Sequence, residues 1–213
     1  MATYDLDEQE RLDELKAWWK RWGSATLFGL ALAVAAVAGW RYWQNHIATQ
    51  SLEAATVYEK LTQSLATNDL KSARESGGLL IEQYKGTAYA PRAALLLARM
   101  HVAAKDAKSA QTQLQWAVSN AKEPAIRDMA RLRLAGVQLD QKAYDAALKT
   151  LAATHSDAFA PRFGDLRGDV LLAQGKTAEA RAAYQSAFGK MAEDDPYRNI
   201  LELKLDALGG DAK

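Results

Sequence analysis

The 213-residue chain contains no cysteine and shows no strong excess of charge of either sign. Without thiols it has no disulfide, no thiolate nucleophile and no cysteine-ligated zinc site. Its 27 Lys and Arg residues nearly balance its 26 Asp and Glu residues, so nothing in the net charge favours a nucleic-acid partner. β-Branched residues are sparse and do not alternate with polar ones, which predicts an essentially all-α protein.

Residue types that catalyse reactions are present but are not grouped. The three histidines, His46, His101 and His155, lie far apart, and no pair has the spacing of zinc ligands. No glycine-rich loop follows a predicted strand, and no twelve-residue loop carries calcium ligands. The sequence therefore predicts no metal, no cofactor and no catalytic activity. A hydrolase with an unrecognised site is the weakest alternative.

The longest stretch without a charged side chain runs for nineteen residues between Arg21 and Arg41. A helix of that length rises roughly 28 Å, close to the hydrocarbon thickness of a bilayer. Aromatic residues, which prefer the headgroup boundary, flank the stretch on both sides: Trp18, Trp19, Trp22, Trp40, Tyr42 and Trp43. This pattern predicts a helix that crosses a lipid bilayer with an aromatic belt at each end.

Two other interpretations of the apolar stretch fit less well. The segment Ala36-Val37-Ala38 matches a signal-peptide cleavage pattern, but the stretch is longer than a signal-peptide core. The segment before it carries six acidic residues, unlike a short basic leader. A buried helix of a soluble protein does not explain tryptophans at both borders.

Basic residues near the ends of the stretch indicate its orientation, because Lys and Arg favour the cytoplasmic side. Four precede the stretch closely: Arg11, Lys16, Lys20 and Arg21. On the far side, Arg41 is followed by no basic residue until Lys60. We expect a single-pass protein of a bacterial inner membrane, with a cytoplasmic tail over 1–21, a span over 22–43 and a periplasmic domain over 44–213.

The part of the chain after the span repeats a pattern of paired helices. Its four prolines are 33, 37 and 35 residues apart, and each precedes a helical stretch. Three segments align, each with a helical stretch, a short polar break and an alanine-rich second helix: 93–118, 135–153 and 166–188. We interpret residues 51–85 as a fourth, degenerate unit with Ala73 in the matching place, and residues 196–208 as a capping helix.

The second helices share one small residue and, one turn later, one larger residue. The small residues are Ala110, Ala147 and Ala180, and the larger ones are Leu114, Leu151 and Tyr184. The small residue lets the paired helix approach, and the larger one fills the space beside it. This pattern resembles the tetratricopeptide repeat, although the usual early tryptophan is absent. The predicted fold is one transmembrane helix followed by a tetratricopeptide-like α-solenoid of about four helix pairs and a capping helix.

Two segments point to a more specific resemblance. The span ends in Gly39-Trp40-Arg41-Tyr42-Trp43, and the repeats contain Asp165-Leu166-Arg167-Gly168-Asp169. In this combination the chain resembles, over nearly its whole length, the ancillary subunits of the SecYEG translocon, the YfgM family of proteobacterial inner-membrane proteins. The resemblance implies a repeat domain tethered beside the SecYEG translocon, in association with a membrane-anchored periplasmic chaperone of the prolyl-isomerase type. It also implies that newly exported client proteins are helped towards soluble chaperones.

In tetratricopeptide domains, residues of the first helix of each pair line the groove. The register of the repeats therefore assigns particular positions of this chain to such a groove. The predicted protein-binding groove consists of Arg92, Leu95, Arg99, Met129, Leu132, Asp165 and Asp169. Such a mixed groove would suit several partners. The alternative is that the apolar members belong to the core and the charged ones are simply solvated. This alternative stays open because a register error of one residue turns a side chain by about 100° around the helix axis.

These features favour a membrane-tethered adaptor that binds proteins at the Sec translocon. The alternative from a different class is a structural scaffold of an envelope complex that assembles the cell wall or the outer membrane. The partners that cross-link to the protein distinguish the two hypotheses.

Overall fold

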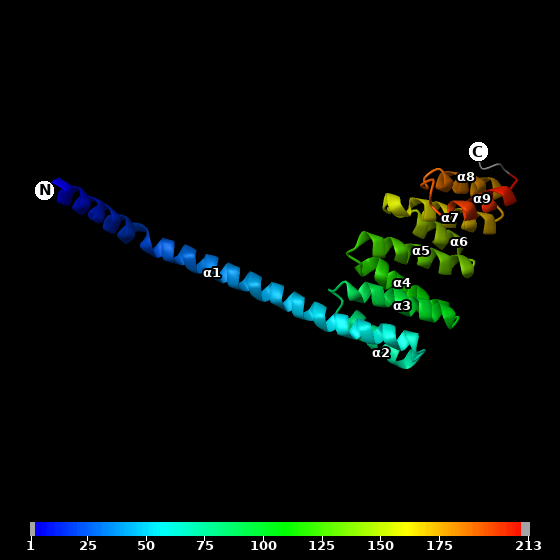
Figure 1. Ribbon diagram of the computed structural model, residues 1–213, viewed down its shortest axis with the longest axis horizontal. Coiled ribbons are helices and arrows are strands. Elements are labelled where there is room, and N and C mark those ends of the chain that lie inside the picture. The colour runs from blue at the N-terminus through cyan, green and yellow to red at the C-terminus, as the bar shows by residue number, and fades with distance from the viewer. Residues whose placement is uncertain (1–2, 210–213) are drawn as a thin grey trace. The chain divides into compact units, whose positions relative to one another are not determined.

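The computed structural model describes residues 3–209, with side chains from residue 10 onward, and that part of the chain is helical without a strand (Figure 1). The helices are α1 (Thr3–Ala66), α2 (Leu70–Gln83), α3 (Tyr89–Ala103), α4 (Ala107–Asn120), α5 (Pro124–Asp140), α6 (Tyr144–Leu151), α7 (Ala160–Ala173), α8 (Thr177–Phe188) and α9 (Arg198–Ala207). A short 3₁₀-helix, η1 (Asp157–Phe159), precedes α7. The prediction of an all-α chain is confirmed.

The chain divides into two units, Met1–Thr49 and Gln50–Lys213. In the first unit, α1 contains a segment that is long and apolar enough to cross a membrane. Large apolar side chains such as Phe28, Leu30 and Val34 are exposed there. An apolar helix without protein packed around it suits lipid better than water. The predicted apolar helix is therefore present, while the boundaries of tail, span and periplasmic domain stay predictions. Met1 and Ala2 of the predicted tail lie outside the described residues.

The second unit is a stack of helix pairs (Figure 1). The part of α1 after Gln50 packs against α2, and three further pairs follow: α3 with α4, α5 with α6, and α7 with α8. Helix α9 packs against α8 and ends at Ala207, and Gly209, two residues later, has a φ of +80° that is typical of a helix stop. The predicted architecture of about four helix pairs and a capping helix is confirmed.

The turn inside each pair has the same backbone shape although its residues differ. One residue per turn adopts a left-handed conformation: Asn68, Lys105 and Lys142, each at φ 58°, and Gly175 at φ 77°. In the first two turns an aspartate follows and caps the second helix, with Asp69 Oδ1 and Asp106 Oδ1 each accepting a bond of 3.0 Å from a backbone N–H. The turns at Lys105, Lys142 and Gly175 coincide with the polar breaks predicted in the three aligned segments.

Small and large side chains complement each other where paired helices meet. All four predicted alanines, from Ala73 to Ala180, are fully buried. In the last pair the ring of Tyr184 covers Gly168 so closely that a Cβ there would lie 2.3 Å from the ring. Between α2 and α3 the small residue lies on a second helix and the large one on a first helix. A Cβ on Gly77 of α2 would lie 2.7 Å from the side chain of Leu97 in α3. The helices therefore approach closely only because one of the two facing residues is small.

The core of this unit is a series of four apolar clusters rather than one central core. Each cluster combines residues of neighbouring helices, from Leu61 and Leu80 at the first pair to Leu201 and Leu205 at the cap. In such an array each repeat is stabilised mainly by its neighbours. The cap helix α9 therefore covers apolar surface that the last pair would otherwise expose.

Candidate functional site

A cleft lies between the first helices of two successive pairs, α3 and α5. It encloses about 330 Å³. Helix α3 contributes Ala98, Arg99 and Val102, helix α5 contributes Arg133, Gly136, Val137 and Asp140, and Leu114 of α4 completes the lining. First helices line the inner side of a helical-repeat array, so this cleft belongs to the face on which such arrays bind peptides.

Two arginines dominate the charge of this cleft, which we call the arginine cleft. Neither Arg99 nor Arg133 forms an ion pair with any side chain between residues 10 and 209. The Arg133 guanidinium donates one long hydrogen bond, of 3.5 Å, to the carbonyl oxygen of Leu95. Partial burial, and then the positive charge of Arg99, lower the pKa of Arg133 from its ordinary value. The two guanidinium groups therefore lie where an anion would relieve their repulsion.

Of the seven predicted groove residues, the structure brings Arg99 alone into the arginine cleft. Arg92 instead pairs with Glu123 at 2.8 Å, and Met129 and Leu132 are half-buried against the core. Leu95, 4% exposed, and Asp165, 5% exposed, are buried. The prediction needs correction at these two positions, because neither side chain is free to contact a partner.

Asp165 and Asp169 belong to a polar cluster that fixes the cap helix. Lys204 of α9 lies 2.7 Å from Asp165 Oδ1 and 2.6 Å from Asp169 Oδ1. The Tyr197 hydroxyl donates to Asp165 at 2.6 Å, and the Tyr184 hydroxyl donates to Asp169 at 2.7 Å. Both carboxylates are therefore already occupied within the chain, and we call this group the cap cluster.

The cap cluster shifts the pKa values of its own members. Burial, followed by the hydrogen bond to Asp169, raises the pKa of Tyr184 well above its ordinary value. Burial and the bond to Asp165 likewise raise the pKa of Tyr197. For Lys204, burial alone would lower the pKa, but the hydrogen bonds to Asp165 and Asp169 outweigh it and raise the pKa. All three groups thus hold their protons more tightly in the folded chain.

Raising the pH above about 10 is expected to destabilise the repeat unit. An unfolded tyrosine or lysine loses its proton near pH 10, whereas Tyr184 and Lys204 retain theirs when folded, so the unfolded state is favoured as pH rises. Urea unfolding of the full chain should show that the free energy of unfolding decreases between pH 9 and about pH 11. In Tyr184→Phe the free energy of unfolding should fall less steeply with pH, by up to about 1.4 kcal/mol per pH unit, which corresponds to one proton. An unchanged slope in this variant would show that Tyr184 titrates normally.

Asp128 in α5 anchors the loop between α6 and α7. It is 2% exposed, and its Oδ2 accepts hydrogen bonds from the Ser156 N–H at 3.0 Å and the Ser156 hydroxyl at 2.9 Å. Arg131 lies 3.2 Å from the other carboxylate oxygen and donates to the Thr154 carbonyl oxygen at 2.6 Å. The sequence does not predict this aspartate, because its partner Ser156 lies 28 residues further along the chain.

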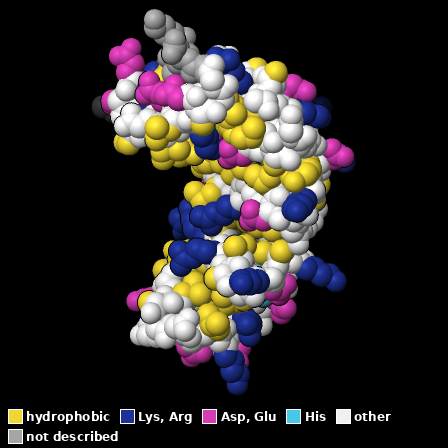
Figure 2. Space-filling view, turned by 90° about the vertical axis from the view of Figure 1, so that its right-hand side faces the viewer, with side chains coloured by type: hydrophobic (Ala, Val, Ile, Leu, Met, Phe, Trp, Pro, Cys, Tyr) yellow, Lys and Arg dark blue, Asp and Glu magenta, His cyan; other side chains and the backbone are white. Residues whose placement is uncertain are grey.

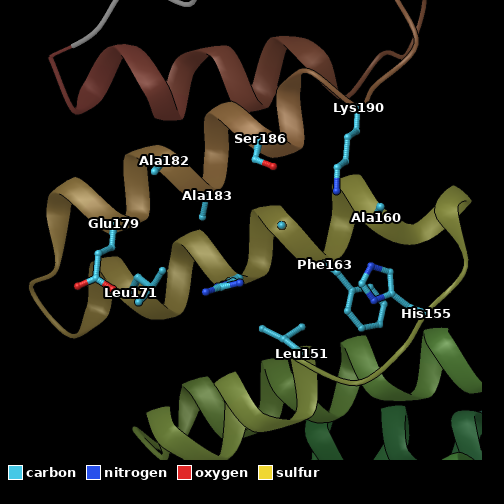
Figure 3. A pocket seen from close by; sticks show the side chains of 12 residues that line it. Leu151, His155, Ala160, Phe163, Leu171, Glu179, Ala182, Ala183, Ser186 and Lys190 are labelled. Atoms are coloured by element: carbon cyan, nitrogen blue, oxygen red, sulfur yellow. The ribbon is translucent and has the colours of Figure 1, made fainter.

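A second cleft, of about 420 Å³, lies between α6, α7 and α8 (Figure 3). Helix α6 has only eight residues, against fourteen in α4, and its last residue, Leu151, lines this cleft. His155 stacks on Phe163 at one end, with ring centroids 4.1 Å apart, and Lys190 points into the same end. Glu179 lies at the other end.

The histidines and carboxylates of the described chain are not gathered into a metal site. Within the described residues no cluster of three His, Asp or Glu side chains could hold a metal ion. His101 interacts with Asp106 at 3.3 Å, and His155 lies against Phe163 and the Ala153 carbonyl oxygen. Both histidines therefore have partners within the chain.

The six predicted belt residues all lie on α1, and all are exposed: Trp18, Trp19, Trp22, Trp40, Tyr42 and Trp43. Trp18 and Trp19 have ring centroids 6.2 Å apart. Their contact with lipid headgroups stays a prediction.

Comparison with known proteins places the chain in a class and then in a family. Residues 16–210 match the family described as tetratricopeptide repeat-like domain, so the chain is a tetratricopeptide-like helical repeat protein with an apolar N-terminal helix. It is 36% identical over 210 residues to the ancillary SecYEG translocon subunit of Neisseria gonorrhoeae, covering 98% of this chain and 100% of the relative.

Two further relatives carry the same name. The Escherichia coli protein is 31% identical over 209 residues, covering 98% of this chain and 99% of the relative. The Haemophilus influenzae protein is 29% identical over 185 residues, covering 87% and 90%. The chain therefore belongs to the family of ancillary SecYEG translocon subunits.

Proposed function

We propose that this protein is a membrane-tethered adaptor at the SecYEG translocon that binds other proteins through its repeats. The observation that carries the proposal is the full-length similarity to relatives named ancillary SecYEG translocon subunits. The apolar segment of α1 supports an anchor in the inner membrane. The positive residues that precede this segment favour a cytoplasmic N-terminus and a periplasmic repeat unit over 44–213.

The proposal extends to the handover of newly exported proteins to periplasmic chaperones. A helical-repeat surface with a cleft on its inner side can hold a peptide or a helix of a partner. A membrane-anchored chaperone of the prolyl-isomerase type is the proposed partner, because the family resemblance implies it. The protein itself would contribute binding and position, without a catalytic step.

Photo-crosslinking in living cells tests this proposal at two surfaces. A photoreactive residue at Leu30 or Val34 in the apolar segment should form adducts with translocon subunits. The same residue at Val102 in the arginine cleft should form adducts with a periplasmic chaperone or with exported chains, which also tests the orientation. Lys108, exposed on α4, serves as the control position outside the cleft. If cell-wall or outer-membrane assembly proteins dominate the adducts instead, the scaffold hypothesis replaces the adaptor.

A further inference from the structure

We infer that the arginine cleft binds an acidic, amphipathic protein segment through Arg99 and Arg133. The inference rests on the proposed adaptor function and deepens it by naming the chemistry of the segment that is bound. Carboxylates of the segment would pair with the two guanidinium groups, while its apolar side chains would cover the apolar part of the cleft.

The first argument is that the charge of the two arginines is not compensated within the chain. Among the residues with described side chains neither has an ion-pair partner, whereas Arg92 and Arg131 on the same two helices each have one. The cleft lining contains a single carboxylate, that of Asp140. A guanidinium presents several N–H donors in a planar fork that matches a carboxylate. Two arginines that line one cleft without an ion-pair partner therefore favour an anionic partner.

The second argument is that the acidic residues Asp165 and Asp169 of the first helix α7 are not free to neutralise the arginines. Asp165 and Asp169 would make the inner face mixed in charge if they were free, but Lys204 and two tyrosine hydroxyls already bind them. The charge that remains available at the arginine cleft is therefore mainly positive. Figure 2 shows Lys and Arg side chains gathered in the hollow of the repeat unit.

The third argument is the apolar surface between the arginines. Val102 is 44% exposed, and Ala98 and Val137 line the same cleft. A Cβ placed on Gly136 would have no atom within 4 Å, so there is room for a side chain of a partner at this point. A purely acidic ligand would leave this apolar surface exposed to water. An amphipathic segment satisfies both parts at once.

The recessed position of the cleft favours a protein segment over the membrane surface. The lining comes from two neighbouring helices with Leu114 of α4 beside them, so it lies in a depression. Anionic lipid headgroups form a flat layer, which contacts protruding side chains more easily than recessed ones. A peptide, by contrast, can enter the depression with its own side chains.

The test uses the full-length chain in nanodiscs of phosphatidylcholine and a labelled peptide of about four helical turns. The peptide carries glutamates and leucines on one face, and a matched peptide carries glutamine in place of glutamate. Fluorescence anisotropy compares the wild type, R99Q/R133Q, R99K/R133K and the charge-matched control R74Q/K108Q, whose two positions line neither cleft. All of the substituted side chains are exposed, so circular dichroism should show unchanged folding.

We expect the acidic peptide to bind the wild type and the control equally, and to bind R99Q/R133Q at least about tenfold more weakly. The lysine variant should be intermediate, because it keeps the charge and loses the planar fork. Equal binding of the glutamine peptide, unchanged binding by R99Q/R133Q, or no binding of the acidic peptide to the wild type would each overturn the inference.

Two further measurements separate the other possible occupants. Sedimentation with phosphatidylglycerol vesicles tests anionic lipid, and analytical ultracentrifugation of the chain in detergent tests a second copy. A dependence of either on Arg99 and Arg133 without peptide binding would overturn the inference in favour of that occupant. Crosslinks from Leu30 to the translocon remain independent of these results, so failure of the inference is distinguishable from failure of the proposed function.

Discussion

Replacing Gly168 with alanine is expected to destabilise the repeat unit by about 3 kcal/mol, the upper part of the range for an overpacked core. The added Cβ would lie 2.3 Å from Cε1 of Tyr184 and 2.4 Å from its Cδ1. This ring cannot move away easily, because it is 1% exposed and its hydroxyl is bound to Asp169. Thermal unfolding of the full chain in detergent, followed by circular dichroism, measures the effect.

Gly78→Ala is the matched control for this substitution. Gly78 also lies within a helix, α2, but a Cβ there would have no atom within 4 Å. Alanine restricts the unfolded chain and suits a helix better than glycine, so this variant should be more stable than the wild type by up to about 1 kcal/mol. If Gly168→Ala behaves like Gly78→Ala, the close approach of α7 and α8 described above is wrong.

Replacing Lys204 with methionine is expected to release the cap helix α9 from α7. The change keeps most of the side-chain stem but removes the cation between two carboxylates, one of which is buried. Breaking a buried pair in this way costs about 3–5 kcal/mol in typical cases, and the 28% exposure of the lysine side chain places the expected loss at about 2–3 kcal/mol. Hydrogen exchange should therefore accelerate in α9 and much less in α3 and α4.

The double variant D165N/K204M distinguishes lost charge balance from lost packing. It removes the buried carboxylate together with its cation, so part of the lost stability should return. Lys108→Met, at an exposed position of α4, controls for the loss of a lysine as such and should leave exchange unchanged. Slow exchange in α9 of Lys204→Met would show that apolar contacts of Leu201 and Leu205 alone hold the cap.

The anchor and the repeat unit suggest a division of labour within the proposed adaptor. The apolar segment of α1 would keep the protein in the membrane beside its partners, and the repeat unit would present the arginine cleft. The cap cluster would contribute by closing the end of the array, so that the acids near the inner face are neutralised. The predictions for Lys204 and for the two cleft arginines can therefore be tested separately.

Much of the architecture follows from the sequence because it depends on local patterns. An uncharged stretch of nineteen residues predicts an apolar helix without knowledge of any other segment. The alanines Ala110, Ala147 and Ala180 repeat because each lies where two adjacent helices meet, and the turns recur at the same interval. Helix pairs of this kind contact mainly their neighbours, so a periodic sequence is enough to predict the stack.

The candidate binding face, in contrast, depends on the tertiary structure. Leu132 was predicted to line the groove, but its neighbour Arg133 does so, since one residue turns a helix face by about 100°. Asp165 was predicted to face a partner, but it is neutralised by Lys204, which lies 39 residues further along the chain. Local patterns determine that helices form and where they pair. Which charges remain free depends on partners that only the folded chain brings together.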